Sequence, residues 1–165
     1  MEIITINRFL EYYEDTRSIT NKVLAAIPHD KLDWTYREGK FTIGDLIRHI
    51  AAIERFVFAE MAIGHKPCYK GCKSDITIGY NSIFDYFEAM HVQTIKILET
   101  VSDVSLSNNI SLIKGREIPL KNLLRNMIIH EVHHRGALCI YLNLLGVSTP
   151  PVLGLMEEQL IELSK

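Results

Sequence analysis

The sequence lacks the features that mark secreted, membrane-bound or nucleic-acid-binding proteins. Its three cysteines, Cys68, Cys72 and Cys139, are too few for a disulfide framework, and their odd number does not allow all of them to pair. A reducing compartment is therefore expected. No apolar run approaches the roughly 18–20 residues that cross a bilayer. The first residues do not show the basic stretch followed by an apolar stretch that would predict a signal peptide. The net charge of −2 offers no basic footprint for nucleic acid. A cytoplasmic protein without membrane or nucleic-acid contacts is therefore expected.

What the sequence does contain is a series of long amphipathic segments. Apolar residues recur at helical spacing and predict four long helices, over residues 6–27, 42–63, 80–101 and 119–145. Asn7 is the expected cap of the first helix, and Thr42 with Asp45 predicts a capping box at the second. No repeat, low-complexity tract or interdomain linker interrupts the chain, so residues 1–165 are predicted to form one domain, an all-α four-helix bundle.

Two shorter elements complete the predicted fold. Residues 110–113 and 117–118 flank Lys114-Gly115-Arg116, which predicts a short β-hairpin just before the last long helix. That helix is expected to stop at Gly146, because glycine favours the backbone conformation that ends helices. A short C-terminal helix is predicted over residues 155–163.

Histidines on the predicted apolar faces are the candidate functional residues. His130 and His134 lie four apart on the apolar side of the last long helix, so their rings can converge on one ion. His49 flanks the apolar stripe of the second helix. Because metal sites in bundles are built from inward side chains on facing helices, these three are predicted to bind a divalent metal. The plainer alternative is that they are hydrogen-bonded core histidines.

Two glutamates lie within the same apolar arcs. Glu131 makes the segment from His130 to His134 an H-E-x-x-H match, the zinc-protease signature in which the glutamate activates water. Zincins take a third ligand further along the chain, and no histidine follows His134. Glu131 and Glu54 are candidate catalytic proton acceptors, or groups that orient the histidines. The alternative is that each pairs with an arginine of the same two helices.

The remaining polar candidates have weaker patterns. Cys68 and Cys72 lie in a predicted loop, at a spacing that is loose for zinc and without a second cysteine pair, so no role is assigned to them. His29, His65 and His91 have no second histidine at helical spacing on an apolar face, and are interpreted as ordinary surface residues.

The chain resembles the DinB-like (YfiT-like) superfamily of metal-dependent enzymes. The matching stretches are residues 39–54, residues 129–136, and Leu144-Leu145-Gly146-Val147 followed by Pro150-Pro151. The resemblance implies a four-helix bundle of up-down-down-up crossover topology, which is often a homodimer. It also implies a divalent metal held by one histidine of the second helix and two of the fourth, here His49, His130 and His134.

The resemblance further implies an enzyme that acts on a small-molecule substrate. A thiol S-transferase or hydrolase is expected, with zinc or nickel as the ion, iron as the third choice, and a low-molecular-weight thiol such as bacillithiol or mycothiol as a further cofactor. Ala137 stands where the family often has glutamine, which keeps open a non-catalytic, metal-stabilised helical dimer or a small-ligand-binding protein. A zincin-like hydrolase is the third alternative.

Overall fold

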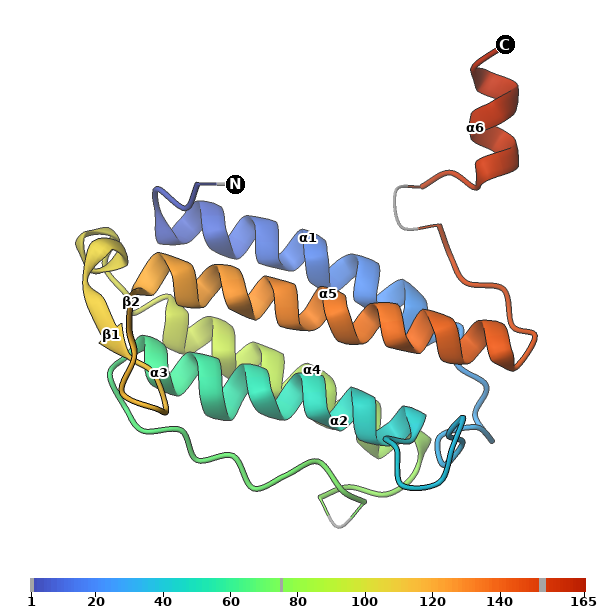
Figure 1. The fold of residues 1–165 in the computed structure, drawn as a ribbon, viewed down its shortest axis with the longest axis horizontal. Coiled ribbons are helices and arrows are strands. Elements are labelled where there is room, and N and C mark those ends of the chain that lie inside the picture. Colours follow the sequence, from blue (N-terminus) through green and yellow to red (C-terminus); the bar gives the residue numbers. More distant parts are fainter. Residues whose placement is uncertain (1, 75, 152–153) are drawn as a thin grey trace.

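Four long helices build the part of the chain that the computed structural model describes, residues 2–74, 76–151 and 154–165. These helices are α1 (Ile6–Ala25), α2 (Ile43–Ile53), α4 (Tyr80–Leu98) and α5 (Leu120–Leu144). α1 packs against α5 and α4, while α2 packs against α4 and α5. In Figure 1, α1 and α5 run in one direction and α2 and α4 run in the other. The all-α bundle with up-down-down-up topology is therefore confirmed.

The parallel course of α2 and α4 requires a connection that returns along the bundle. Residues 63–74 and 76–79 lie in it, and Figure 1 shows them running along the outside of α2. The return path carries Tyr69 back beside α2, where its hydroxyl oxygen lies 3.1 Å from Nδ1 of His49. The topology therefore supplies a side chain to the neighbourhood of the predicted histidine cluster.

The second predicted helix contains a wide turn. After α2 the chain continues through the π-helical segment η1 (Glu54–Ala59) and the short helix α3 (Glu60–Ala62). A π turn places one extra residue in the helical register, so side chains beyond it are rotated relative to a regular helix. Glu54 is the first residue of the turn and is only 2% exposed. The wide turn therefore begins at a buried carboxylate.

The ends of the elements follow local hydrogen bonding. Thr5 caps α1 in place of the expected Asn7, because the Thr5 side chain accepts a hydrogen bond from the Arg8 backbone amide. The predicted capping box of Thr42 and Asp45 is confirmed.

The remaining elements are the 3₁₀ helix η2 (Asp103–Ser107), the strands β1 (Asn109–Ser111) and β2 (Glu117–Pro119), and α6 (Glu157–Leu163). The two strands pair as the predicted hairpin. Among the described residues, no helix is long and apolar enough to cross a membrane.

A layer of buried polar side chains divides the core. On α1, Phe9 and Tyr13 belong to an apolar cluster at one end of the bundle and Val23 and Leu24 to a cluster at the other, with Arg17 between them. The other three long segments contribute to the same layer. The buried polar members are Thr16, Arg17, Thr20, Glu54, His91, Thr94, Glu131 and Arg135. All four segments therefore meet in one polar cross-section.

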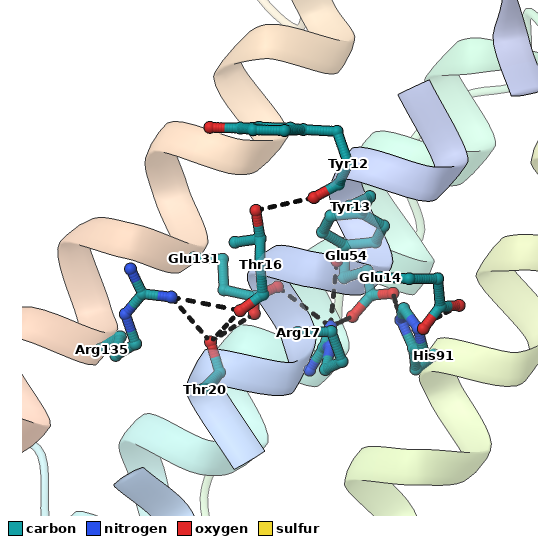
Figure 2. A network of polar contacts seen from close by, with 10 residues as sticks. All are labelled: Tyr12, Tyr13, Glu14, Thr16, Arg17, Thr20, Glu54, His91, Glu131 and Arg135. Atoms are coloured by element: carbon teal, nitrogen blue, oxygen red, sulfur yellow. Dashed lines mark hydrogen bonds and ion pairs between the residues drawn. The ribbon is translucent and has the colours of Figure 1, made fainter. Parts of the chain in front are cut away.

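Arg17 lies at the centre of this layer (Figure 2). Its side chain is 2% exposed and forms ion pairs with Glu54 and, at 3.1 Å, with Glu131. The guanidinium also donates a hydrogen bond of 2.9 Å to the Tyr13 hydroxyl and lies 4.1 Å from the ring centre of Phe87. A charge buried this deeply is tolerated only when it is paired. Arg17 therefore joins α1 to η1 and to α5.

Replacing Arg17 with methionine should destabilise the fold strongly. The substitution leaves the Glu54 and Glu131 carboxylates buried without their shared cation, and loss of one partner of a buried pair costs about 3–5 kcal/mol. Urea denaturation monitored by circular dichroism measures the change. Lys31→Met is the control, because Lys31 pairs with Asp30 at the surface and its loss should leave the midpoint almost unchanged. Equal midpoints for the two variants would contradict this role.

Candidate metal centre

Two facing helices bring the three predicted histidines together. His130 and His134 lie one turn apart on α5, with ring centres separated by 4.5 Å. His49 on α2 faces both, at 4.6 Å from His134 and 5.0 Å from His130 between ring centres. One nitrogen of each ring can be chosen so that all three lie within 4.8 Å of one another. This spacing suits three imidazoles around one ion.

The closest approach within the cluster is between two nitrogens. Nε2 of His130 lies 3.2 Å from Nε2 of His49. On the other side of the His49 ring, Nδ1 lies 3.1 Å from the Tyr69 hydroxyl oxygen. A hydrogen bond at Nδ1 fixes the ring orientation and leaves Nε2 free to bind a cation. Tyr69 is therefore positioned to hold His49 in a ligating orientation.

Apolar rings surround the three imidazoles without sealing them from solvent. Phe41 lies 5.2 Å from His49 and Phe58 lies 5.8 Å from His130, between ring centres. Each of the three histidines is half-buried. The cluster is therefore partly exposed to solvent and bordered by aromatic rings. This combination is typical of sites that react with a ligand from solution.

Burial keeps the three imidazoles neutral near pH 7. Burial, together with the neighbouring histidines, lowers the pKa of His130 to about 3. The same causes lower the pKa of His134 to about 4, and burial also lowers the pKa of His49. A neutral imidazole has a free lone pair, which metal binding requires. The donor set therefore fits a divalent cation.

The two predicted catalytic glutamates do not join this cluster. Glu131 is 1% exposed and accepts a 2.6 Å hydrogen bond from the Thr20 hydroxyl, besides its ion pair with Arg17. Glu54 is held by Arg17 and by Nδ1 of His91 at 2.8 Å. Figure 2 shows both carboxylates directed at Arg17 within the polar layer. The expected pairing with arginines of the same two helices was wrong, because Arg17 of α1 takes both.

His91 is buried, and the interpretation of it as a surface residue was wrong. Its side chain is 6% exposed, and it links Glu54 to Glu14, which lies 3.1 Å away and is half-exposed. Burial would lower the pKa of His91, but the hydrogen bond and the charge of Glu54 outweigh burial and raise it. Burial likewise opposes ionisation of Glu54, and the Arg17 charge and His91 overcome it, so the Glu54 pKa is lowered.

The cysteines and the other histidines do not contribute to the group of converging ligand atoms. Cys68 is exposed and Cys72 is buried, and both are free thiols. His133 is exposed with its ring 4.9 Å from that of His134, but it is not part of the group of converging ligand atoms. His29 stacks on Tyr80, and His65 contacts Glu60. Within the described residues, the three histidines form the single group suited to a metal ion.

A model of the DinB family matches residues 3–162. The chain belongs to the DinB family. A DinB-like protein from Bacillus cereus ATCC 10987 has the same fold, with 21% identity, a TM-score of 0.74, and coverage of 90% of this chain and 97% of that one. YfiT from Bacillus subtilis, reported as a probable metal-dependent hydrolase with an unusual four-helix bundle topology, has 16% identity and a TM-score of 0.68 over 87% of this chain and 89% of its own.

A third structure with this fold is a mycothiol-dependent maleylpyruvate isomerase. It is 17% identical, with a TM-score of 0.64, and the match covers 81% of this chain and 60% of that one. At these identities the likenesses show a shared fold. They agree with the four-helix bundle topology seen here.

Two side chains that shape the site region were not anticipated from the sequence. Tyr69 lies in the long loop, where no periodic pattern indicates which side chain turns inward. Arg17 follows Tyr13 by four residues, so it falls on the buried side of α1. That spacing was a usable signal for a buried cation that needs a carboxylate partner.

Removing the Tyr69 hydroxyl should weaken cation binding by the histidine cluster. Tyr69→Phe leaves the ring in place but loses the hydrogen bond to His49, and comparable losses reduce metal affinity by about 10- to 100-fold. Competition against a fluorescent zinc chelator measures the affinity. Tyr36→Phe is the control, because the Tyr36 ring packs on Tyr141 and does not touch the cluster. An unchanged affinity in Tyr69→Phe would remove Tyr69 from the site.

Proposed function

We propose that the chain is a metal-dependent enzyme that transfers a thiol to an electrophilic small molecule, with one divalent cation held by His49, His130 and His134. The observation that supports this is the convergence of three neutral, half-buried imidazoles, with no further histidine, cysteine or carboxylate among the described residues in the group. Three protein ligands leave a coordination position open for a small molecule, as catalytic sites require. Zinc or nickel suits three imidazoles, and iron is the third choice.

The cation supplies one chemical effect, which is to lower the pKa of a water or thiol that coordinates it. The side chains supply the rest. The imidazoles stay neutral, Tyr69 orients His49, and the rings of Phe41 and Phe58 restrict water around the cluster.

The surroundings of the cluster favour a thiol over water as the nucleophile. A free thiol has a pKa of about 8.5, so it ionises with little assistance, whereas water at about 15.7 needs far more. Glu131 and Glu54 would be the natural bases, and both are held in ion pairs with Arg17. In the proposed transfer the thiolate sulfur forms a bond to carbon, the leaving group takes the electron pair, and the thiol proton goes to solvent.

The zincin-like alternative finds less support in the geometry. In that mechanism the glutamate of the H-E-x-x-H segment must reach the water beside the metal. Here Glu131 is buried in the polar layer with Arg17 and Thr20, on a different side of α5 from His130. A non-catalytic metal-stabilised protein is the remaining alternative, and it differs from an enzyme in having no exchangeable position on the ion.

Metal content tests the proposed site directly. Elemental analysis of untagged protein should find about one divalent ion per chain, with the ion lost in His49→Ala and in His134→Ala. His65→Ala is the matched control, because His65 is exposed, pairs with Glu60 and is not in the group of converging ligand atoms, so the ion should remain. Wild-type protein that takes up no zinc or nickel when these are offered would contradict the proposal.

Activity is tested with small thiols and an electrophile. Bacillithiol, mycothiol, cysteine and glutathione are each incubated with a monohalobimane and the metal-loaded protein. Metal-dependent formation of the S-conjugate, lost in His134→Ala, is the expected result. Hydrolysis of model esters or amides without thiol transfer would favour the hydrolase, and neither activity with an occupied site would favour the non-catalytic alternative.

A further inference from the structure

A second pocket lies between η1 and α4, whereas the histidine cluster lies between α2 and α5. Its volume of about 440 Å³ is in the range of small-molecule sites. The return loop, defined as residues 63–74 and 76–79, forms one wall. The lining residues are Phe56 of η1, Tyr86 of α4, and Cys68, Lys70, Gly71 and Ile76 of the return loop. None of them belongs to the group of converging histidine atoms, so the pocket is a separate site.

Consecutive residues of the return loop serve the two sites. The Tyr69 hydroxyl oxygen lies 3.1 Å from Nδ1 of His49, while Cys68 and Lys70, on either side of Tyr69, line the pocket. The Cys68 backbone amide donates a 2.9 Å hydrogen bond to the Phe56 carbonyl oxygen, which ties the return loop to η1. Two walls of the pocket are therefore joined directly, and the pocket is formed without a ligand.

The wide turn of η1 directs two phenylalanines to different sites. Phe58 lies 5.8 Å from His130 between ring centres, whereas Phe56 lines the pocket. The Arg55 guanidinium lies 5.3 Å from the Phe56 ring centre and pairs with Glu60. Wide turns of this kind occur frequently at functional sites, where the extra residue redirects side chains. Here the turn supplies an aromatic wall to the pocket.

The lining favours a ligand with an apolar body and one negative charge. Phe56, Ile76 and Tyr86 offer apolar and aromatic surface. Lys70 is the one cation among the six lining residues, and none of the six is a carboxylate. In the sequence, residues 63–79 contain three lysines and one aspartate, so this stretch has a net charge of +2 with histidine neutral. An aromatic carboxylate matches both the rings and the charge.

We propose that this pocket binds a small aromatic carboxylate, with the ligand ring between Phe56 and Tyr86 and its carboxylate beside Lys70. The Lys70 ammonium group donates a hydrogen bond to the carboxylate, and the apolar lining excludes water from the ring. The site is separate from the histidine cluster, and it depends neither on a bound metal nor on the proposed activity.

Protection of Cys68 from alkylation tests occupancy of the pocket in the unaltered protein. Cys68 is an exposed free thiol, and Cys139, which does not line the pocket, is the internal reference. The probe is 2-naphthoate and the reagent is iodoacetamide, with modification of each cysteine followed by peptide mass spectrometry. At a probe concentration about ten times its Kd, modification of Cys68 should slow about tenfold, because only the unoccupied pocket reacts. An unchanged rate at Cys68, or equal slowing at Cys139, would overturn the proposal.

Calorimetry with matched variants tests the aromatic walls and the cation separately. Phe56→Ala and Tyr86→Ala should each weaken 2-naphthoate binding by about tenfold or more, because each removes an aromatic wall. Lys70→Gln should weaken it by about two- to fivefold, as expected for an exposed ion pair. Lys73→Gln is the control, because Lys73 is in the same loop but does not line the pocket. Binding of the uncharged 2-naphthalenemethanol should not respond to Lys70→Gln, and equal losses for the alcohol and the carboxylate would overturn the proposal.

Variants of the histidine cluster separate the pocket from the proposed metal centre. Phe41→Ala removes a ring beside His49, and His134→Ala removes one of the three imidazoles, so both should leave the 2-naphthoate affinity unchanged. Circular dichroism should show the same helical content in all variants. Loss of binding in either cluster variant would place the probe at the histidines and overturn the proposal. Absence of metal from the wild type bears only on the proposed function.

Discussion

The ion pairs of Arg17 with Glu54 and Glu131 are the constraint on which the rest of the bundle depends. They tie α1 to η1 and to α5, and His91 extends the network to α4. A charged group this deep fixes the relative height and rotation of the helices, because sliding by one residue would leave a charge unpaired. Apolar packing above and below the layer tolerates small shifts far more easily.

This constraint also sets the position of the three histidines. His130 and Glu131 are consecutive, so their side chains leave α5 about 100° apart. Anchoring Glu131 against α1 therefore turns His130 and His134 toward α2, where His49 lies. On the second segment, Glu54 is one helical turn and a residue beyond His49, at the start of the π turn. The buried ion pairs and the histidine cluster therefore depend on the same rotation of α5 about its axis.

Much of the fold could be predicted because it follows from periodic patterns. The long helices, the capping box at Thr42, and the hairpin around Gly115 each have a local signal, and the structure confirms them. The meeting of the three histidines was also predictable, from the i, i+4 pair on α5 and one histidine flanking the stripe of α2. That agreement concerns their geometry, and metal binding stays a prediction.

The rest depended on contacts between distant segments. The spacing of Arg17 from Tyr13 places it on the buried side of α1, but which carboxylates it meets depends on how α1 packs against η1 and α5. His91 lay on the buried arc of its helix, but its partner Glu54 comes from another element. The π turn has no sequence signature, and Tyr69 is placed by the path of a loop. Such features emerge only when the whole bundle is assembled.

In the proposed site the histidines hold the cation, while Glu131 stabilises the helix packing through Arg17. X-ray absorption at the metal edge of zinc-loaded protein tests both halves in one measurement. Three imidazole nitrogens at about 2.0–2.1 Å, with the remaining position filled by solvent or an added thiol, is the predicted result. A protein carboxylate in the first coordination sphere that is lost in Glu131→Gln would contradict the account, as would fewer than three imidazoles.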